Sequence, residues 1–405
     1  MNDMTGHFLY RVEYEGVGSQ LTNLRRVLSS ADKSFRVTIS RTVGQDTTPA
    51  PASLSPPSVH NNTTAPADYL HIVVKSKPID TALIELTNIM AQLQGGEFAE
   101  EYDAVKDMTG FRNSHIREIE LAELAWKVGG AMERISTKVY NVMRNDSQQL
   151  YALCLEYLDP ATGTISHMNS TDAALSTWSS QDIHTVLRDV ADFHAQFLGA
   201  DSMLLNELSF LENPSRNLMQ SLRSTYEAMA DTNHRNNSTL FDETLTDAIK
   251  SYLKHSNSYW SLLERSPRTL RDVVEFLAFV LPPGSKEWSH YIEYHRLALW
   301  SSLERLRRHS ADHGMSTSTS TTTITMQQPL WRQDDIRFPT QREYLDVAKV
   351  ALMDFASLRL SMIGISNSFK TVSWLPRILD SVRSQILMMG PLRPELDKVI
   401  SASRI

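Results

Sequence analysis

The feature that most constrains the fold is a change in the spacing of apolar residues near Asp80. Before this point, short runs of β-branched and aromatic residues bounded by turn formers predict strands. After it, apolar residues recur mainly at the 3.6-residue period of amphipathic helices. A chain that separates its strands from its helices in this way belongs to the α+β class. We therefore expect a sheet-bearing first part and a mostly helical second part.

The expected elements divide the chain near a turn-rich cluster that begins at Asp159. The expected strands are residues 8–14, 35–40, 69–75, 137–143 and 150–158. The expected helices are residues 80–94, 114–135, 182–197, 215–230, 240–264, 272–281, 287–308, 340–363 and 375–389. This pattern predicts an N-terminal lobe over 1–159 and a helical C-terminal lobe over 160–405. Each lobe contains a Ser/Thr/Pro-rich or Ser/Thr-rich insertion, near 45–67 and 314–328, that we expect to be disordered.

Charge and cysteine content exclude several classes of function. The formal net charge of −7 provides no general attraction to phosphate backbones, so we expect no nucleic-acid partner. The single cysteine, Cys154, excludes an intramolecular disulfide and any cysteine-based zinc site. The polar first residues lack the apolar core of a secretory signal, and the longest apolar stretch, 347–365, contains three charged residues. We expect a cytoplasmic protein with no membrane partner.

Lys75 closes an apolar strand, and a helix containing Glu118 and Glu120 follows about 40 residues later. Kinase-like folds hold a strand lysine against the phosphates of ATP by pairing it with a helix glutamate. The alternative is a lysine that points into solvent and glutamates on a polar helix face. The pattern alone favours this alternative.

The strand that ends at residues 156–158 changes abruptly from apolar to acidic and aromatic residues. Backbone groups of Glu156, Tyr157 and Leu158 at a lobe boundary could pair with the edge of an adenine base. An ordinary strand end would give the same pattern. The position of this segment, about 80 residues after Lys75, favours the hinge interpretation.

Two histidines lie in helical patterns that could carry chemistry. Leu187, Ala191 and His194 share one helix face, which favours a hydrogen-bonded core histidine over a catalytic base or a ligand. The second, His295, lies between Glu293 and Arg296. For this polar cluster a solvated helix face is the favoured interpretation, and contact with a substrate is the alternative.

The order of these features resembles the aminoglycoside phosphotransferase and choline kinase-like family of the protein-kinase-like fold. The resemblance includes the family helix pattern Leu-x-x-Leu-Ala-x-(Leu/Phe)-His-Ala-x-Phe, here residues 187–197 with Val190 in place of the second leucine. It implies a bilobal fold and an ATP site between the lobes, with phosphoryl transfer to a small-molecule hydroxyl. In that site Lys75 would contact the phosphates, Glu118 or alternatively Glu120 would orient it, and 156–158 would be the hinge.

The chain departs from the family at the catalytic loop. We find no His-x-Asp-x-x-x-x-Asn segment; the nearest fragment begins at His255 and places Asn257 and Leu262 at the catalytic positions. Residues 266–270 resemble the segment before the family's loop, whereas 271–280 resemble the helix after its metal-binding strand. A block of roughly 30 residues is therefore missing between Leu270 and Arg271. We predict no catalytic residues, no identifiable magnesium site and weak ATP binding.

The first hypothesis is therefore a catalytically inactive phosphotransferase-like protein whose small-molecule substrate cannot be read from the sequence. The alternative is a non-catalytic helical binding or scaffold protein that uses the inter-lobe cleft. The first hypothesis also predicts an exposed apolar patch where the missing block would have packed. The residues expected to be partly uncovered are Val273, Phe276, Leu277 and Val280.

Overall fold

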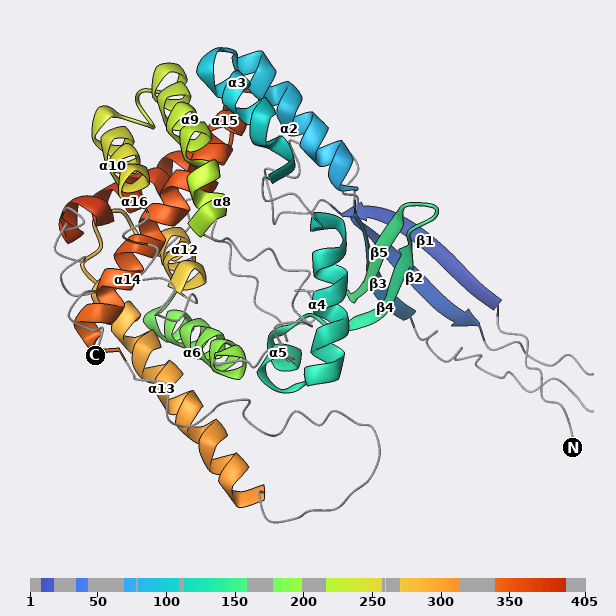
Figure 1. Cartoon of the computed structure of the whole chain (residues 1–405). Coiled ribbons are helices and arrows are strands. Elements are labelled where there is room, and N and C mark those ends of the chain that lie inside the picture. The colour runs from blue at the N-terminus through green and yellow to red at the C-terminus, as the bar shows by residue number, and fades with distance from the viewer. Residues whose placement is uncertain are drawn as a thin grey trace, which may run out of the picture. The chain divides into compact units, whose positions relative to one another are not determined.

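The computed structural model describes residues 9–17, 34–42, 69–77, 79–108, 113–158, 178–198, 216–256, 259, 270–313 and 339–390. These residues form one antiparallel sheet and a larger set of helices, which confirms the α+β class (Figure 1). They fall into two compact units, one with the strands and one with the helices. Residues 79–136, which the sequence assigns to the N-terminal lobe, group with the helical unit. The expected insertions, 45–67 and 314–328, lie outside the described residues.

The first unit is a five-stranded sheet in the order β1-β2-β3-β5-β4, with each neighbouring pair antiparallel. All five expected strands are present among the described residues. Their bounds are β1 Leu9–Val17, β2 Ser34–Thr42, β3 Tyr69–Ser76, β4 Val139–Asn145 and β5 Leu150–Glu156. The turn between β4 and β5 contains Gln149 with φ of 52°, a left-handed conformation that a tight hairpin favours.

The register of the sheet separates its residues into two faces. In the register, Val37 of β2 pairs with Ile72 of β3 and with Tyr14 of β1. Lys75 is three residues from Ile72 and therefore lies on the other face.

The second unit contains helices whose bounds agree closely with the apolar periodicity at several positions. They are α2 Asp80–Gln94, α3 Gly96–Val105, the 3₁₀ turn η1 Lys106–Met108, α4 Ser114–Val128, α5 Gly130–Ile135, α6 Ser180–Phe197, α8 Arg216–Ser221, α9 Arg223–Asn236, α10 Glu243–Lys254, α12 Leu270–Val280, α13 Trp288–His313, α14 Gln341–Asp354, the π-helix η4 Phe355–Leu360, α15 Ser361–Asn367 and α16 Leu375–Met389. The expected helix 114–135 is divided at Gly129 and Gly130, which both have positive φ. Helix α3 was not expected.

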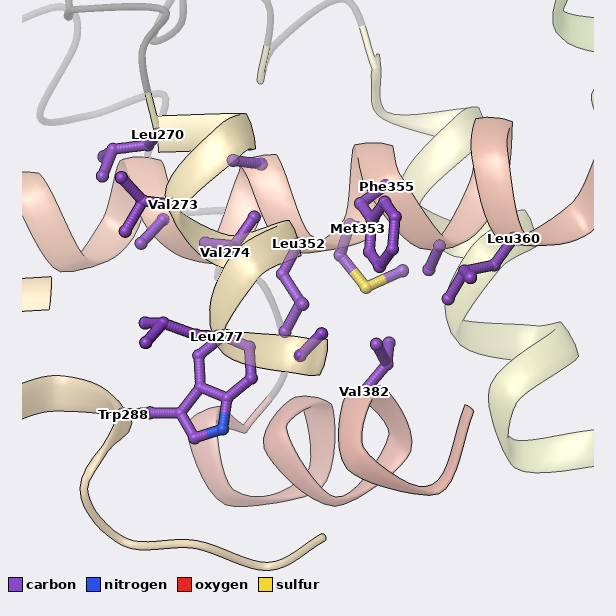
Figure 2. Close-up of a cluster of buried hydrophobic side chains, with 14 of the residues drawn as sticks. Leu270, Val273, Val274, Leu277, Trp288, Leu352, Met353, Phe355, Leu360 and Val382 are labelled. Atoms are coloured by element: carbon purple, nitrogen blue, oxygen red, sulfur yellow. The ribbon is translucent and has the colours of Figure 1, made fainter. Parts of the chain in front are cut away.

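The core of the helical unit is built around α12, which packs against α6, α13, α14 and α16. Figure 2 shows Val274 and Leu277 of α12 in one cluster with residues of α14 and α16. Val273 and Leu277 have no exposed surface and Val280 is 2% exposed. Phe276 packs edge-on against Trp178, with ring centroids 5.4 Å apart. The expected apolar patch is therefore wrong for Val273, Leu277 and Val280, which the neighbouring helices cover, whereas Phe276 is only partly buried.

Hydrogen-bonded caps define where two of the long helices begin. Ser179 and Asp182 form a reciprocal capping box at the start of α6, and Thr340 and Glu343 form one at the start of α14. Among the described helices, none is both long and apolar enough to cross a membrane.

Candidate functional site

Lys75 and the expected hinge lie on neighbouring strands of the first unit. Lys75 of β3 is opposite Leu153 of β5, and three residues away Ile72 is opposite Glu156. At about 3.3 Å per residue, Lys75 and Glu156 are about 10 Å apart along this strand pair. The structure thus brings the lysine and the hinge segment into one part of the sheet.

The expected hinge segment, 156–158, leaves the sheet directly after Glu156, its last paired residue. The backbone N–H of Glu156 donates to the carbonyl oxygen of Lys138 over 2.8 Å. Tyr157 and Leu158 follow outside the strand; Tyr157 is partly buried and Leu158 is 38% exposed. The Glu156 N–H is therefore already hydrogen-bonded within the sheet. A base bound at this segment would have to pair with other backbone groups of residues 156–158.

Glu118 and Glu120 belong to α4 in the helical unit, and both are partly buried on either side of the fully buried Ile119. The start of α4 is held by Asp80, which accepts hydrogen bonds from Ser114 Oγ over 3.0 Å and from His115 Nδ1 over 2.8 Å. This anchoring fixes α4 within the helical unit. The pairing of either glutamate with Lys75 remains a prediction.

A second concentration of ionisable groups lies on α12, and sequence reasoning did not identify it as a site. We call it the α12 polar cluster: Arg271, Asp272 and Glu275 of α12 with their partners Asp354, His194 and Arg359. Arg271 lies 3.3 Å from Asp354, Asp272 lies 3.4 Å from His194, and Glu275 lies 2.6 Å from Arg359. One short helix is therefore joined by ionisable groups to α14, α6 and η4.

Burial changes the acidity of three groups in or beside this cluster. It raises the pKa of Asp354, and nearby Arg271 partly opposes the rise. It also raises the pKa of Glu275, against the effect of Arg359. The pKa of Tyr252, whose hydroxyl lies 3.4 Å from Asp354, is raised well above its usual value, first by burial and then by Asp354. Such concentrations of perturbed groups occur at functional sites and also in structural ion-pair networks.

His194 also begins a chain of buried hydrogen bonds. Its Nδ1 lies 3.4 Å from Nε2 of His295, and Nδ1 of His295 lies 2.8 Å from the hydroxyl of Tyr344. His194 is 4% exposed, which confirms the hydrogen-bonded core histidine. The solvated-face interpretation is wrong for His295, which has no exposed surface. Glu293 and Arg296 instead form a bidentate ion pair, with both N–O distances 2.7 Å.

One proton arrangement satisfies the whole chain with both imidazoles neutral. Tyr344 donates to His295 Nδ1, His295 Nε2–H donates to His194, and His194 Nε2–H donates to Asp272. Burial, followed by the effect of His194, lowers the pKa of His295 well below 6.5. The neutral arrangement is consistent with that shift.

The lowered pKa of His295 predicts a loss of stability in mild acid. Below about pH 6.5 the unfolded chain takes up a proton at this position and the folded chain does not, so the free energy of unfolding falls by up to about 1.4 kcal/mol per pH unit. His295→Gln should reduce this slope between pH 7 and pH 5, measured by urea unfolding. His255→Gln, at an exposed histidine, is the control and should keep the wild-type slope. Equal slopes in all three proteins would contradict the prediction.

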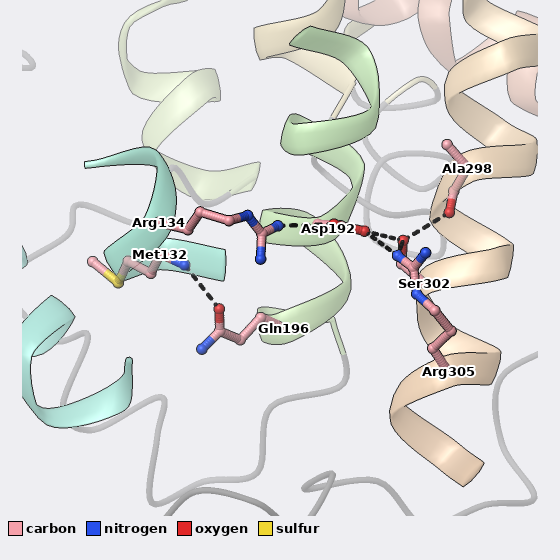
Figure 3. A network of polar contacts seen from close by, with 7 residues as sticks. All are labelled: Met132, Arg134, Asp192, Gln196, Ala298, Ser302 and Arg305. Carbon is pink, nitrogen blue, oxygen red and sulfur yellow. Dashed lines mark hydrogen bonds and ion pairs between the residues drawn. The ribbon is translucent and has the colours of Figure 1, made fainter. Parts of the chain in front are cut away.

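Asp192 joins three helices on another side of α6. It accepts hydrogen bonds from Arg134 of α5 over 2.9 Å, from Arg305 of α13 over 2.5 Å and from Ser302 (Figure 3). Gln196, one turn further, accepts a hydrogen bond from the Met132 N–H over 3.1 Å. These contacts use the polar side of α6 to position α5 and α13, so we assign them a structural role.

Comparison with known proteins gives no match to this chain among family models, curated proteins or solved structures. Within the described part of the chain, no group of three or more His, Cys, Asp or Glu side chains is arranged to hold a metal ion.

Proposed function

We propose that this protein is related to ATP-dependent small-molecule kinases, has a kinase-like bilobal fold, and binds ATP weakly without ordinary phosphoryl transfer. The observation that carries the proposal is the pairing of β3 with β5, which sets the lysine strand beside the hinge strand. Lys75 would contact the phosphates, and backbone groups of 156–158 would contact the base. Glu118, or Glu120, would orient Lys75. The single cysteine suits a reducing compartment such as the cytoplasm.

The absence of turnover follows from the missing catalytic segment. A positioned general base contributes roughly 10²- to 10⁴-fold to the rate, and metal ions neutralise the charge that develops on the transferred phosphoryl group. The sequence contains no catalytic-loop motif that would supply these groups, and Lys75 alone cannot replace them.

A specific observation favours a second candidate, a helical binding or scaffold protein without turnover. The apolar face of α12 lies in the continuous core of the helical unit, where Val273, Val274 and Leu277 have no exposed surface. A protein that acts by binding alone needs no catalytic segment beside α12. A core without a gap at this position is therefore expected for such a protein. This candidate predicts that ATP has no measurable affinity for the protein.

Lys75→Met is expected to lower ATP affinity about 10- to 100-fold, because a hydrogen bond from a charged group to a ligand contributes roughly 1.5–3 kcal/mol. Isothermal titration calorimetry of the full chain with ATP measures this change. Lys138→Met is the matched control: Lys138 is an exposed lysine of the same unit whose ammonium lies over the Tyr140 ring.

Three outcomes would each reject part of the first proposal. Unchanged affinity in Lys75→Met, or no binding by the wild-type protein, would reject the proposed nucleotide site. Transfer of phosphate from ATP at rates typical of kinases, about 1–100 s⁻¹, would reject the inactive assignment.

A further inference from the structure

The long helix that contains α14, η4 and α15 changes its hydrogen-bonding pattern after Asp354. The Phe355 N–H donates to the carbonyl oxygen of Ala351, four residues back, as in an α-helix. The Ser361 N–H donates to the carbonyl oxygen of Ala356, five residues back, as in a π-helix. A π-helical turn within an α-helix is rare and frequently lies at a functional site, so this turn requires a specific cause.

Two ion pairs from α12 hold the two ends of this π-helical turn. Arg271 lies 3.3 Å from Asp354, directly before η4, and Glu275 lies 2.6 Å from Arg359 within η4. Residues four apart share one side of an α-helix, and residues five apart share one side of a π-helix. In an α-helix, Asp354 and Arg359 would instead point about 140° apart, because each residue turns the helix by about 100°. The two ion pairs therefore favour the π-helical register over an α-helix.

The same register decides which residue faces α9. Gly364 of α15 lies against α9, where a Cβ atom at this residue would come within 2.6 Å of Asn233 Oδ1. A π-helical turn takes up one residue more than an α-helical turn, so a continuous α-helix would bring Ile363 to this place. The Ile363 side chain does not fit where even a single Cβ atom would clash. In the α-helical register α15 would therefore have to move away from α9.

The Glu275 end of this arrangement responds to mild acid. Burial raises the pKa of Glu275, and Arg359 partly opposes the rise. Loss of Arg359 would raise this pKa further, so by linkage acid favours the state in which the pair is broken. The other charged groups that act on Glu275 are Arg271, which lowers its pKa, and Asp272, which raises it.

The Asp354 end responds in the same direction. Burial raises the pKa of Asp354, whereas Arg271 and the hydrogen bond from Tyr252 of α10 oppose the rise. Loss of Arg271 would likewise raise this pKa, so acid weakens both ends of the turn.

From this arrangement we propose that η4 is an acid-sensitive register switch. The two ion pairs to α12 hold the π-helix at neutral pH, and their loss in mild acid returns the segment to an α-helix and releases α15 from α9. The switch lies within the helical unit and involves neither Lys75 nor the hinge segment 156–158.

The test is hydrogen exchange of the full chain, followed by mass spectrometry at pH 7 and pH 5 and corrected for the pH dependence of the intrinsic exchange rate. Protection of the α15 amides should fall at least about tenfold relative to protection of the α16 amides, which lie in the same core and report general unfolding. Glu275→Gln should lower the relative protection of α15 already at pH 7. Glu293→Gln, which breaks an ion pair within α13, is the matched control and should keep the wild-type response.

A deletion tests the register itself. Removal of Leu358 leaves the number of residues that a continuous α-helix needs to keep Gly364 in its present place. The relative protection of α15 should then be high at both pH values. A deletion variant that keeps the wild-type pH response would show that the π-helix is not the responding element.

Three further outcomes would overturn the proposal. The first is equal relative protection of α15 at pH 7 and pH 5 in the wild-type protein. The second is the same effect in Glu293→Gln as in Glu275→Gln, which would show a general response to lost charge. The third is loss of the response in His295→Gln, which would assign it to the buried histidines. Should Glu275→Gln fail to fold, Arg359→Gln removes the same ion pair at an exposed residue.

Discussion

Leu277→Ala is expected to lower the free energy of unfolding by about 3 kcal/mol, the usual cost of removing a leucine side chain from a packed core. Leu277 has no exposed surface and lies in the cluster that α12 forms with α13, α14 and α16 (Figure 2). The surrounding helices cannot close the resulting cavity without moving the ion pairs of the α12 polar cluster. Urea unfolding followed by circular dichroism measures the change.

The matched control is Leu297→Ala on α13, where the same truncation removes a leucine that is 52% exposed. We expect its effect to be below about 0.5 kcal/mol. If Leu277→Ala also costs less than about 1 kcal/mol, α12 borders an open edge, and the exposed patch expected from a missing segment would have to be reconsidered.

Gly364→Val is expected to destabilise the protein by a similar amount, about 3 kcal/mol, through overpacking. A Cβ atom at residue 364 would lie 2.6 Å from Oδ1 of Asn233 and 2.6 Å from two ring atoms of Phe241. Asn233 cannot easily move away, because its Nδ2 donates to the carbonyl oxygen of Ser361 over 2.8 Å. The contact between α15 and α9 therefore requires a residue without a side chain.

A double-variant cycle tests this mechanism directly. Phe241→Leu removes the ring atoms that a Cβ would meet, so Gly364→Ala should cost at least about 1 kcal/mol less in that background than in the wild type. Ser368→Ala, at an exposed position just after α15, is the control and should have almost no effect. Additive effects of Gly364→Ala and Phe241→Leu would show that the two residues do not compete for space.

The period of apolar residues predicted most helices of the described chain, and strand composition predicted all five strands. Helix α2 and helix α16 match their expected bounds at both ends. The pattern failed where backbone geometry decides: the 114–135 helix divides at Gly129, and 340–363 contains a π-helical turn after Asp354. Helix α3 escaped notice because two positive-φ glycines, Gly95 and Gly96, mark a turn between α2 and α3 that resembles a loop in sequence.

Candidate site residues could be predicted from the sequence only where neighbouring residues of one strand or helix form a recognisable pattern. Lys75 and the expected hinge residues 156–158 were proposed from local patterns, and the sheet places Lys75 and Glu156 on adjacent strands. The α12 polar cluster was missed because its members come from three separate segments of the chain, near residues 194, 271–275 and 354–359. Asp354 could have indicated that this cluster exists. It is a carboxylate within the apolar run 347–365, and a carboxylate needs hydrogen-bonding or charged partners when such a run is buried.

The pairing of β3 with β5 also has a consequence for synthesis on the ribosome. After β3 emerges, its partner β5 begins only after roughly 75 further residues, which at about 5–20 residues per second takes about 4 to 15 seconds. During that interval β1, β2 and β3 can pair while the outer edge of β3 still lacks its partner strand. An unpaired edge is a template for joining other chains. The nascent protein thus passes through a period in which prompt folding, or protection by a chaperone, decides its yield.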